Sequence, residues 1–332
     1  MKLTELLTGV GTEPVASSKA KTDITGLTSD SRAVKPGDLF IAVPGTKADG
    51  ASYVHEAVQR GAAAVLAEKA LPGVTVPVFV TGSARKALAL VAGNFYGNPA
   101  REVVLLGVTG TNGKTTTAWL VDAMCTAGGS SVGVFGTIEV RWPGTKRVPT
   151  HTTPDPITLH RTLREMVDGG VDTVVMEVSS HALAQERIHG LTFRAAGFTN
   201  LSRDHLDFHK DMEAYFQAKR RLFTDHLSPG GIAVVNGDDT YTNRIYSEMR
   251  QLKRMAWKFS RFGNGEISVA GAELTANGIK ATLKTPAGDI PVKSKLVGAH
   301  NLDNILTAAG IALGFGAGRR DVQDGIERVT RV

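Results

Sequence analysis

Several features that would give an early indication of function are missing from this chain of 332 residues. Its single cysteine, Cys125, cannot form an intrachain disulfide, and a cysteine-based zinc site is not expected. The N-terminus lacks the apolar core of a signal peptide, and no stretch of about 18 apolar residues occurs anywhere. These absences indicate a reducing compartment, and we expect a cytoplasmic protein that does not associate with membranes.

Dense basic runs are also missing, although the formal net charge is +6. Lysine and arginine are scattered in pairs, such as Arg220 with Arg221 and Arg319 with Arg320. A nucleic-acid-binding tract would instead show a clustered basic run with interleaved aromatic residues. We therefore expect anionic small molecules, and no nucleic acid, as partners.

The composition that remains is typical of a globular α/β enzyme, with 42% hydrophobic and 21% charged residues and 37 glycines. At about 150 residues per domain, the length predicts two domains. Residues 27–101 alternate strand-like and helix-like segments, and Gly97-Asn98-Pro99 interrupts the last helix. We predict a small N-terminal α/β domain over residues 1–100 and a central domain over residues 101–332.

The central domain opens with the apolar run Val103 to Val108, followed by a glycine-rich turn and a helical segment from Lys114 to Thr126. Strand and helix patterns then alternate up to residue 236, which predicts a mostly parallel sheet flanked by helices. Residues 266–297 differ, because short β-like runs alternate there with glycine turns. A helix is predicted to follow from Asn301 to Phe315.

The glycine-rich turn reads GVTGTNGKTTT from Gly107 to Thr117. Such a loop holds phosphates with backbone N–H groups and a helix N-terminus, and its lysine reaches the outer phosphates. The strict pattern G-x-x-x-x-G-K-[ST] needs glycine at position 108, where this chain has valine. The alternative is a plain turn that ends in an exposed lysine, but the flanking strand and helix favour a phosphate-binding loop.

Two acidic or imidazole side chains follow predicted strand ends. Val171 to Val178 forms an apolar strand with Glu177 near its end, where a ligand role is favoured over an ion pair or helix cap. The segment Ser202 to His209, SRDHLDFH, follows another short strand. Alone it is more typical of capping and solvated polar surface, but its position favours metal ligation by His205.

The helix predicted from Asp211 to Asp225 has an apolar stripe, and Lys219 falls on that stripe. A lysine in such a position usually extends its amine to solvent. The periodicity therefore marks Lys219 as unusual and assigns it no role.

The motifs TGTNGKTT and DHLDFH…MEAYFQAKRRLF resemble those of the Mur ligases, which are ATP-dependent amide-bond-forming ligases. Their variant P-loop is shared with folylpolyglutamate synthetases. The resemblance implies that Lys219 is carbamylated and holds one magnesium ion with Glu177 and His205, while Thr115 and the ATP phosphates hold a second. It makes Lys114, Lys219, Glu177 and His205 catalytic. The implied ATP-binding residues are Gly110, Thr111, Asn112, Gly113, Lys114, Thr115, Thr116, Asn301 and Asn304.

Within that family, the motifs LTSDSR, PGDLFIAV and GTKADG resemble the uridine-binding domain of the MurE branch. THTTPD and SSHALAQER resemble its substrate segments, with His151 where the family commonly has Asn. By themselves these segments are polar turns or helix caps. The residues implied to contact UDP-MurNAc-L-Ala-D-Glu are Leu27, Ser29, Ser31, Thr46, Lys47, Ala48, His151, Thr152, Thr153, Ser179, Gln185 and Arg187.

The resemblance implies a ligase of peptidoglycan precursor synthesis. ATP would phosphorylate the D-glutamate γ-carboxylate, and the amine of meso-diaminopimelate or L-lysine would attack the acyl phosphate. MurE proteins continue into a third domain that binds the amino acid, and we expect that domain to be absent here. The chain alone, expected to be a monomer, would then bind ATP and the UDP-sugar without completing ligation.

Two other functions stay open on the sequence. One is a non-catalytic module that binds nucleotide and UDP-sugar, which calorimetry combined with an amide-formation assay would separate from a ligase. The other is a folate or poly-amino-acid ligase, which the uridine-type first domain disfavours.

Overall fold

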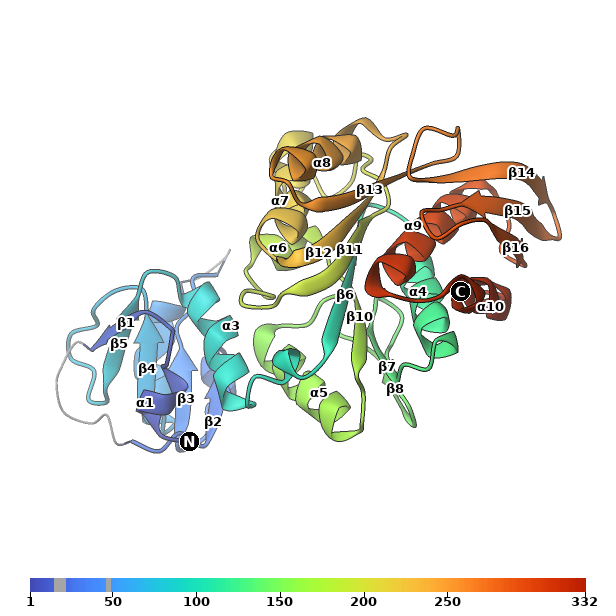
Figure 1. Ribbon diagram of the computed structural model, residues 1–332. Coiled ribbons are helices and arrows are strands. Elements are labelled where there is room, and N and C mark those ends of the chain that lie inside the picture. Colours follow the sequence, from blue (N-terminus) through green and yellow to red (C-terminus); the bar gives the residue numbers. More distant parts are fainter. Residues whose placement is uncertain (15–21, 46–48) are drawn as a thin grey trace. The chain divides into compact units, whose positions relative to one another are not determined.

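The computed structural model describes residues 1–14, 22–45 and 49–332, which form two compact units (Figure 1). The predicted substrate contacts Thr46, Lys47 and Ala48 lie outside the described residues. The first unit consists of Met1–Ala100, Asp155–Glu165 and Gln185–Gly190, and the second of Arg101–Pro154, Met166–Ala184 and Leu191–Val332.

The first unit is built on a five-stranded sheet in the order β1-β5-β4-β3-β2, in which only the β1 pairing is antiparallel. Its strands are β1 (Thr12–Pro14), β2 (Gly26–Thr28), β3 (Asp38–Ile41), β4 (Ala64–Ala67) and β5 (Val78–Thr81). Its helices are α1 (Leu3–Leu6), α2 (Val54–Gln59), α3 (Ala84–Phe95) and the 3₁₀ turns η1 (Ser31–Ala33) and η2 (Gly50–Tyr53).

Two hydrophobic cores lie on the two faces of this sheet. Because alternate residues of a strand point to opposite faces, β3 directs Leu39 and Ile41 to a core shared with α1 and α3. Phe40, between them, belongs to the core shared with α2. The continuous apolar runs of β3 and β4 follow from this burial on both sides.

The second unit contains an eleven-stranded sheet in the order β16-β15-β14-β13-β12-β11-β6-β10-β7-β8-β9. All pairings from β7 to β14 are parallel, and the pairings at both edges are antiparallel. The strands are β6 (Val104–Thr109), β7 (Val132–Phe135), β8 (Val140–Trp142), β9 (Thr145–Arg147), β10 (Thr173–Glu177), β11 (Phe193–Phe198), β12 (Leu227–Asn236), β13 (Met255–Ser260), β14 (Ile267–Thr275), β15 (Gly278–Lys284) and β16 (Ile290–Ser294).

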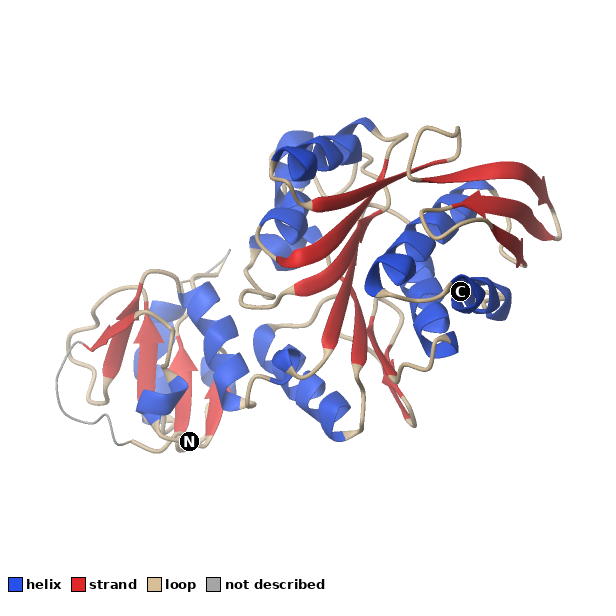
Figure 2. Cartoon of the chain, in the orientation of Figure 1, coloured by secondary structure: helices blue, strands red, loops and turns tan. Residues whose placement is uncertain are grey.

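Helices cover both faces of this sheet (Figures 1 and 2). One face carries α4 (Lys114–Ala127), α9 (Ala299–Phe315) and α10 (Arg319–Arg328), and the other carries α6 (Ser180–Ala184), α7 (Met212–Thr224) and α8 (Thr240–Gln251). The remaining elements are α5 (Pro156–Asp168) and the turn η3 (Pro99–Arg101). No helix among the described residues is long and apolar enough to cross a membrane.

The predicted α/β class and the mostly parallel sheet flanked by helices are confirmed. Residues 266–297, predicted as short β-like runs, form the antiparallel strands β14, β15 and β16 that extend the parallel sheet. A bend separates β7 from β8 and reverses the chain.

The carboxyl ends of three central strands lie side by side. Glu177 of β10 pairs with Val108 of β6, and Phe198 of β11 pairs with Thr109 of β6. Whatever follows these strands is therefore gathered at one edge of the sheet, where open α/β sheets bind ligands.

A buried histidine in the first unit makes its stability depend on pH. His160 of α5 lies close to Gly93 of α3, and its Nδ1 has no hydrogen-bond partner among the described residues. Burial lowers the pKa of His160 from 6.5 to about 4. Between these values the unfolded chain binds a proton that the folded chain does not, so stability is present above about pH 6.5 and is lost as the pH falls toward 4.

We expect His160→Gln to reduce this loss. At about pH 5 the lowered pKa of His160 reduces the free energy of unfolding by about 2 kcal/mol. Between about pH 7.5 and pH 5, the unfolding free energy of the variant should therefore fall by about 2 kcal/mol less than that of the parent. Urea unfolding of both proteins at the two pH values measures the difference, from which contributions of other histidines cancel. Equal losses in parent and variant would contradict the assignment.

Candidate functional site

The predicted phosphate-binding loop connects β6 to α4 and depends on two glycines. Gly110 has φ +147° and Gly113 has φ +84°, which L side chains rarely adopt. A Cβ at Gly110 would lie 1.9 Å from Thr199 Oγ1, and one at Gly113 would lie 2.1 Å from Asn304 Oδ1. The backbone is thus held against its neighbours at a distance that only glycine permits.

Residues that follow β11 fix the middle of this loop. The Thr199 hydroxyl donates to the Asn112 carbonyl at 2.6 Å, and the Asn200 side chain both donates to and accepts from the Asn112 backbone at 3.1 Å. The Thr111 N–H donates to the Asn200 carbonyl at 2.9 Å. Sequence reasoning did not single out Thr199 or Asn200, although their place directly after a central strand is a usable signal.

Two lysine amines meet at one carbonyl of the loop. Lys114 Nζ donates to the carbonyls of Gly110 at 3.0 Å and Thr111 at 2.8 Å, and Lys219 Nζ donates to the same Gly110 carbonyl at 2.8 Å. Lys219 is only 1% exposed, and burial together with the charge of Lys114 holds its pKa well below the usual value. The Lys219 side chain therefore favours the neutral amine, which is a nucleophile.

Helix α7 presents Lys219 to the loop and is itself fixed there. Asp211 caps its N-terminus by accepting from the Ala214 N–H at 2.8 Å. One turn before Lys219, the buried Tyr215 places its hydroxyl 3.3 Å from Thr111 Oγ1, and its ring centroid lies 4.8 Å from Lys219 Nζ. The apolar stripe that made Lys219 unusual in the sequence is the face of α7 that packs over the loop.

Glu177 ends β10 with no exposed surface. Its two carboxylate oxygens accept from the N–H and from the hydroxyl of Thr137, each at 2.9 Å. Burial lowers the pKa of Lys114, and the negative charge of Glu177 opposes this shift. The carboxylate therefore interacts electrostatically with the lysine of the loop. The structure thus places Glu177, Lys114 and Lys219 around the loop.

His205 lies in a left-handed turn, with φ +52°, and its side chain is 45% exposed. Its ring centroid is 4.9 Å from that of His181 and 6.0 Å from that of Tyr215. The buried His209 is joined to Ser180 Oγ through Nε2 at 2.9 Å, and burial, with nearby cationic groups, lowers its pKa to about 4. Within the described part of the chain, no three His, Cys, Asp or Glu side chains gather as a metal centre.

The predicted substrate residues of the second unit lie beside Glu177. Thr153 is buried, donates to the backbone carbonyl of Glu177 at 2.8 Å and accepts from the Ser179 N–H at 3.1 Å. Thr152 is half-buried, and His151 is exposed. Thr153 therefore attaches this loop to the end of β10.

Gln185 and Arg187, also predicted to bind substrate, belong to the first unit. Arg187 donates to Gln185 Oε1 through Nε at 3.1 Å and through a terminal nitrogen at 2.8 Å. Burial lowers the pKa of Arg187, and the carboxylate of Asp155 opposes that shift. The guanidinium is thus held in place by a neighbouring amide.

A pocket of about 480 Å³ adjoins the loop. Asn301 and Asn304 line it and are joined by a 3.0 Å hydrogen bond from Asn304 Nδ2 to Asn301 Oδ1. Thr117 Oγ1 donates to Asn304 Oδ1 at 3.5 Å, which connects the pair to α4. Other lining residues are Asn112, Gly113, Thr116, Asn200, Leu296, His300 and Asp303.

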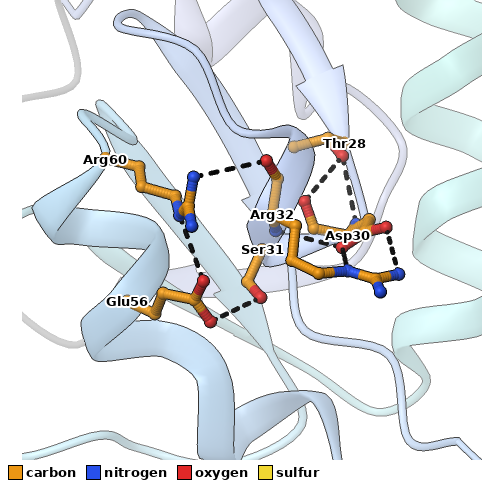
Figure 3. A network of polar contacts seen from close by, with 6 residues as sticks. All are labelled: Thr28, Asp30, Ser31, Arg32, Glu56 and Arg60. Atoms are coloured by element: carbon orange, nitrogen blue, oxygen red, sulfur yellow. Dashed lines mark hydrogen bonds and ion pairs between the residues drawn. The ribbon is translucent and has the colours of Figure 1, made fainter.

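A second pocket, of about 630 Å³, lies within the first unit. The predicted residues Ser29 and Ser31 line it, whereas Leu27 lies on β2 and packs against the core. Ser31 donates to Glu56 at 2.9 Å, and Glu56 also accepts from Arg60 at 3.0 Å (Figure 3). Glu56 could not be predicted as part of this pocket, because it lies 25 residues from Ser31 and belongs to no motif.

The charges around this second pocket are paired. The Arg32 guanidinium donates to both oxygens of Asp30, at 2.9 and 2.8 Å, and holds the pKa of that carboxyl below its usual value (Figure 3). Arg60 pairs with Glu56 through one contact, from Nε to Oε1 at 3.0 Å. The pocket therefore offers hydroxyls and paired ions to a polar ligand.

The sequence profile of the Mur ligase middle domain matches residues 108–312, and that of the Mur ligase family catalytic domain matches residues 23–96. The chain belongs to the Mur ligase family. Its P-loop, Glu177 and Lys219 all lie within the stretch that matches the Mur ligase middle domain.

Curated relatives of this Mur ligase include UDP-N-acetylmuramoyl-L-alanyl-D-glutamate–2,6-diaminopimelate ligases, the MurE enzymes. The protein of Gloeobacter violaceus is 43% identical over 323 residues, which cover 95% of this chain and 63% of the relative. That of Geobacter metallireducens is 42% identical over 345 residues, which cover 100% and 65%. A solved structure of a ligase of the same name matches with a TM-score of 0.86 at 26% identity, covering 98% and 66%. The chain thus spans about two thirds or slightly less of these relatives.

We expect that Asn304 cannot move aside to make room for a Cβ atom at Gly113. Gly113 and Gly129 flank α4, and both have positive φ, but only Gly113 has a close neighbour for an added Cβ. The left-handed backbone costs about 1–2 kcal/mol in either alanine variant. Gly113→Ala should therefore lose more unfolding free energy than Gly129→Ala, as measured by urea denaturation, whereas equal losses would show that Asn304 moves aside freely.

Proposed function

We propose that this Mur ligase is a MurE-type enzyme, in which ATP activates the D-glutamate carboxylate of UDP-MurNAc-L-Ala-D-Glu for attack by the amine of meso-diaminopimelate. The observation that carries the proposal is the meeting of Lys114 and Lys219 at the Gly110 carbonyl. One amine is on a phosphate-binding loop, and the other is buried, with its pKa held well below the usual value by burial and by the charge of Lys114. This pairing suits a site that combines phosphate binding with a modified lysine.

The loop geometry supports ATP as the nucleotide, and Mur ligases use ATP and magnesium. Gly110 and Gly113 leave the loop without side chains at its two tightest points, and backbone N–H groups at the start of α4 can approach an anion. Lys114 would exchange its two carbonyl partners for phosphate oxygens. The pocket at Asn301 and Asn304 is the corresponding place for the adenine.

The residues around the loop also fit magnesium. The buried carboxylate of Glu177 supplies the oxygen ligand that magnesium prefers, and Thr115 lies on the first turn of α4. Magnesium, when bound, neutralises charge on the phosphoryl group that is transferred. We propose that carbamylated Lys219, Glu177 and His205 would hold one magnesium ion and that Thr115, together with the ATP phosphates, would hold a second.

Carbamylation of Lys219 is chemically reasonable because carbon dioxide reacts with an unprotonated amine. A bond forms between Nζ and the carbon of carbon dioxide, and the nitrogen releases one proton. Burial and Lys114 both favour the neutral amine that this step needs. The product is an anion beside Lys114, so that a neutral neighbour of the Lys114 ammonium group is replaced by one of opposite charge.

The pocket of the first unit is proposed to bind the uridine diphosphate part of the substrate through Ser29 and Ser31. Leu27, Thr46, Lys47 and Ala48 are proposed as further contacts of the same part of the substrate. His151, Thr152, Thr153, Ser179, Gln185 and Arg187 are proposed to bind the muramoyl-dipeptide. The residues that select the amine are not assigned. The enzyme is proposed to act as a monomer in the cytoplasm, where the buried thiol of Cys125 stays reduced.

Calorimetry on this chain tests the two binding sites separately. We expect MgATP and UDP-MurNAc-L-Ala-D-Glu each to bind, Gly113→Ala to lose MgATP only, and Ser31→Ala to weaken only the UDP-sugar, by about tenfold for one hydrogen bond. Gly129→Ala should bind both ligands like the parent. No binding of MgATP by the parent would overturn the proposal.

Carbamylation gives a direct signal. In ¹³C-bicarbonate, the parent should show a carbamate carbon resonance by NMR that is absent in Lys219→Ala. Lys210→Ala, which removes an exposed lysine from the neighbouring loop, should retain it. A signal that persists in Lys219→Ala, or one that never appears in the parent, would contradict the assignment.

A further inference from the structure

We propose that Thr137 is a positioning residue that orients the Glu177 carboxylate for magnesium and connects it to the substrate loop at Thr152. The proposal rests on the function proposed above. Thr137 lies in the bend between β7 and β8, outside every motif that the sequence indicated. Its role follows from the direction of three hydrogen bonds.

Both oxygens of Glu177 are fixed by Thr137. The backbone N–H donates to Oε1 and the hydroxyl donates to Oε2, each at 2.9 Å. Two donors from one residue determine the plane of the carboxylate and leave lone pairs on both oxygens for another ligand. Because Glu177 is fully buried, its orientation depends on such contacts and not on solvent.

The hydroxyl of Thr137 has only one proton, which it gives to Glu177. Its other contact, 3.1 Å from Thr152 Oγ1, must then be one in which Thr152 donates. The three groups therefore form a directed chain from Thr152 through Thr137 to Glu177. Loss of the Thr152 hydroxyl can therefore affect the orientation of the Glu177 carboxylate only through the hydroxyl of Thr137.

The bend that carries Thr137 is itself held firmly. The Gly136 N–H donates to the Glu139 carbonyl at 3.0 Å. The carboxylate of Glu139 is buried and pairs with Arg141 and Lys146, and Arg141 also pairs with Asp122 of α4. These ion pairs attach the bend to the helix of the phosphate loop, so Thr137 approaches Glu177 from a fixed position.

Thr137 is exposed, so its hydroxyl can be removed without opening a cavity in the core. Thr137→Val loses the hydroxyl and keeps the N–H, whereas Thr137→Ser keeps both donors. Loss of a group that orients a metal ligand typically weakens metal binding by about 10–100-fold. We expect a weakening of about tenfold or more in Thr137→Val and an affinity close to that of the parent in Thr137→Ser.

The measurement is Mn²⁺ binding to the parent chain and its variants, followed by electron paramagnetic resonance in the presence of a non-hydrolysable ATP analogue. Thr152→Val should weaken Mn²⁺ binding less than Thr137→Val, and the double variant should match Thr137→Val, since the Thr152 contact acts only through Thr137. Thr275→Val, which removes a partly buried hydroxyl bonded to the Gly278 carbonyl, should leave Mn²⁺ binding unchanged.

Glu177→Gln distinguishes a failure of the role of Thr137 from a failure of the metal assignment of Glu177. If it weakens Mn²⁺ binding and Thr137→Val does not, or if Thr137→Ser fails to restore affinity, the role of Thr137 is wrong and the proposed function stands. If Glu177→Gln leaves Mn²⁺ binding unchanged, the metal assignment and the role of Thr137 both fail. Urea unfolding of each variant confirms that the compared proteins are folded.

Discussion

The second unit depends on the contact of two lysine side chains with one backbone carbonyl, that of Gly110. An amine from α4 and an amine from α7 approach the same oxygen, although two ammonium groups would repel each other there. The buried amine of Lys219 resolves this conflict by favouring its neutral form. The fold thereby maintains a nucleophilic amine beside a cationic one, inside a loop that has no side chains at its two tightest points.

This arrangement persists because the loop is held from three directions. Thr199 and Asn200 hold its middle from the end of β11, Tyr215 holds Thr111 from α7, and Asn304 lies against Gly113 from α9. Each support comes from a separate element, so the loop cannot relax without moving several elements. Such preorganised backbone donors are the usual basis of phosphate binding and of phosphoryl transfer.

Glu177, at the end of β10, is also held by contacts from another part of the chain. A fully buried carboxylate is costly unless it is bonded, and both of its oxygens are bonded to one threonine from a bend two strands away in sequence. In the first unit, Ser31 is similarly tied to Glu56, and Arg32 and Arg60 balance the carboxylates (Figure 3). In both units a side chain from a conspicuous motif is fixed by one that the sequence does not mark.

The sequence alone determined the α/β class, the alternation of strands and helices, the glycine-rich loop after β6 and the unusual status of Lys219, since these follow from local periodicity and from motifs within a few residues. It could not determine where the amine of Lys219 points, why the pKa of that amine is lowered, or that Thr137 holds Glu177. Those facts join residues separated by 109 positions, for Gly110 and Lys219, and by 40, for Thr137 and Glu177. Only the parallel pairing of β6, β10 and β11 brings their ends to one edge of the sheet, and burial there changes the protonation of groups that would be ordinary in an extended chain.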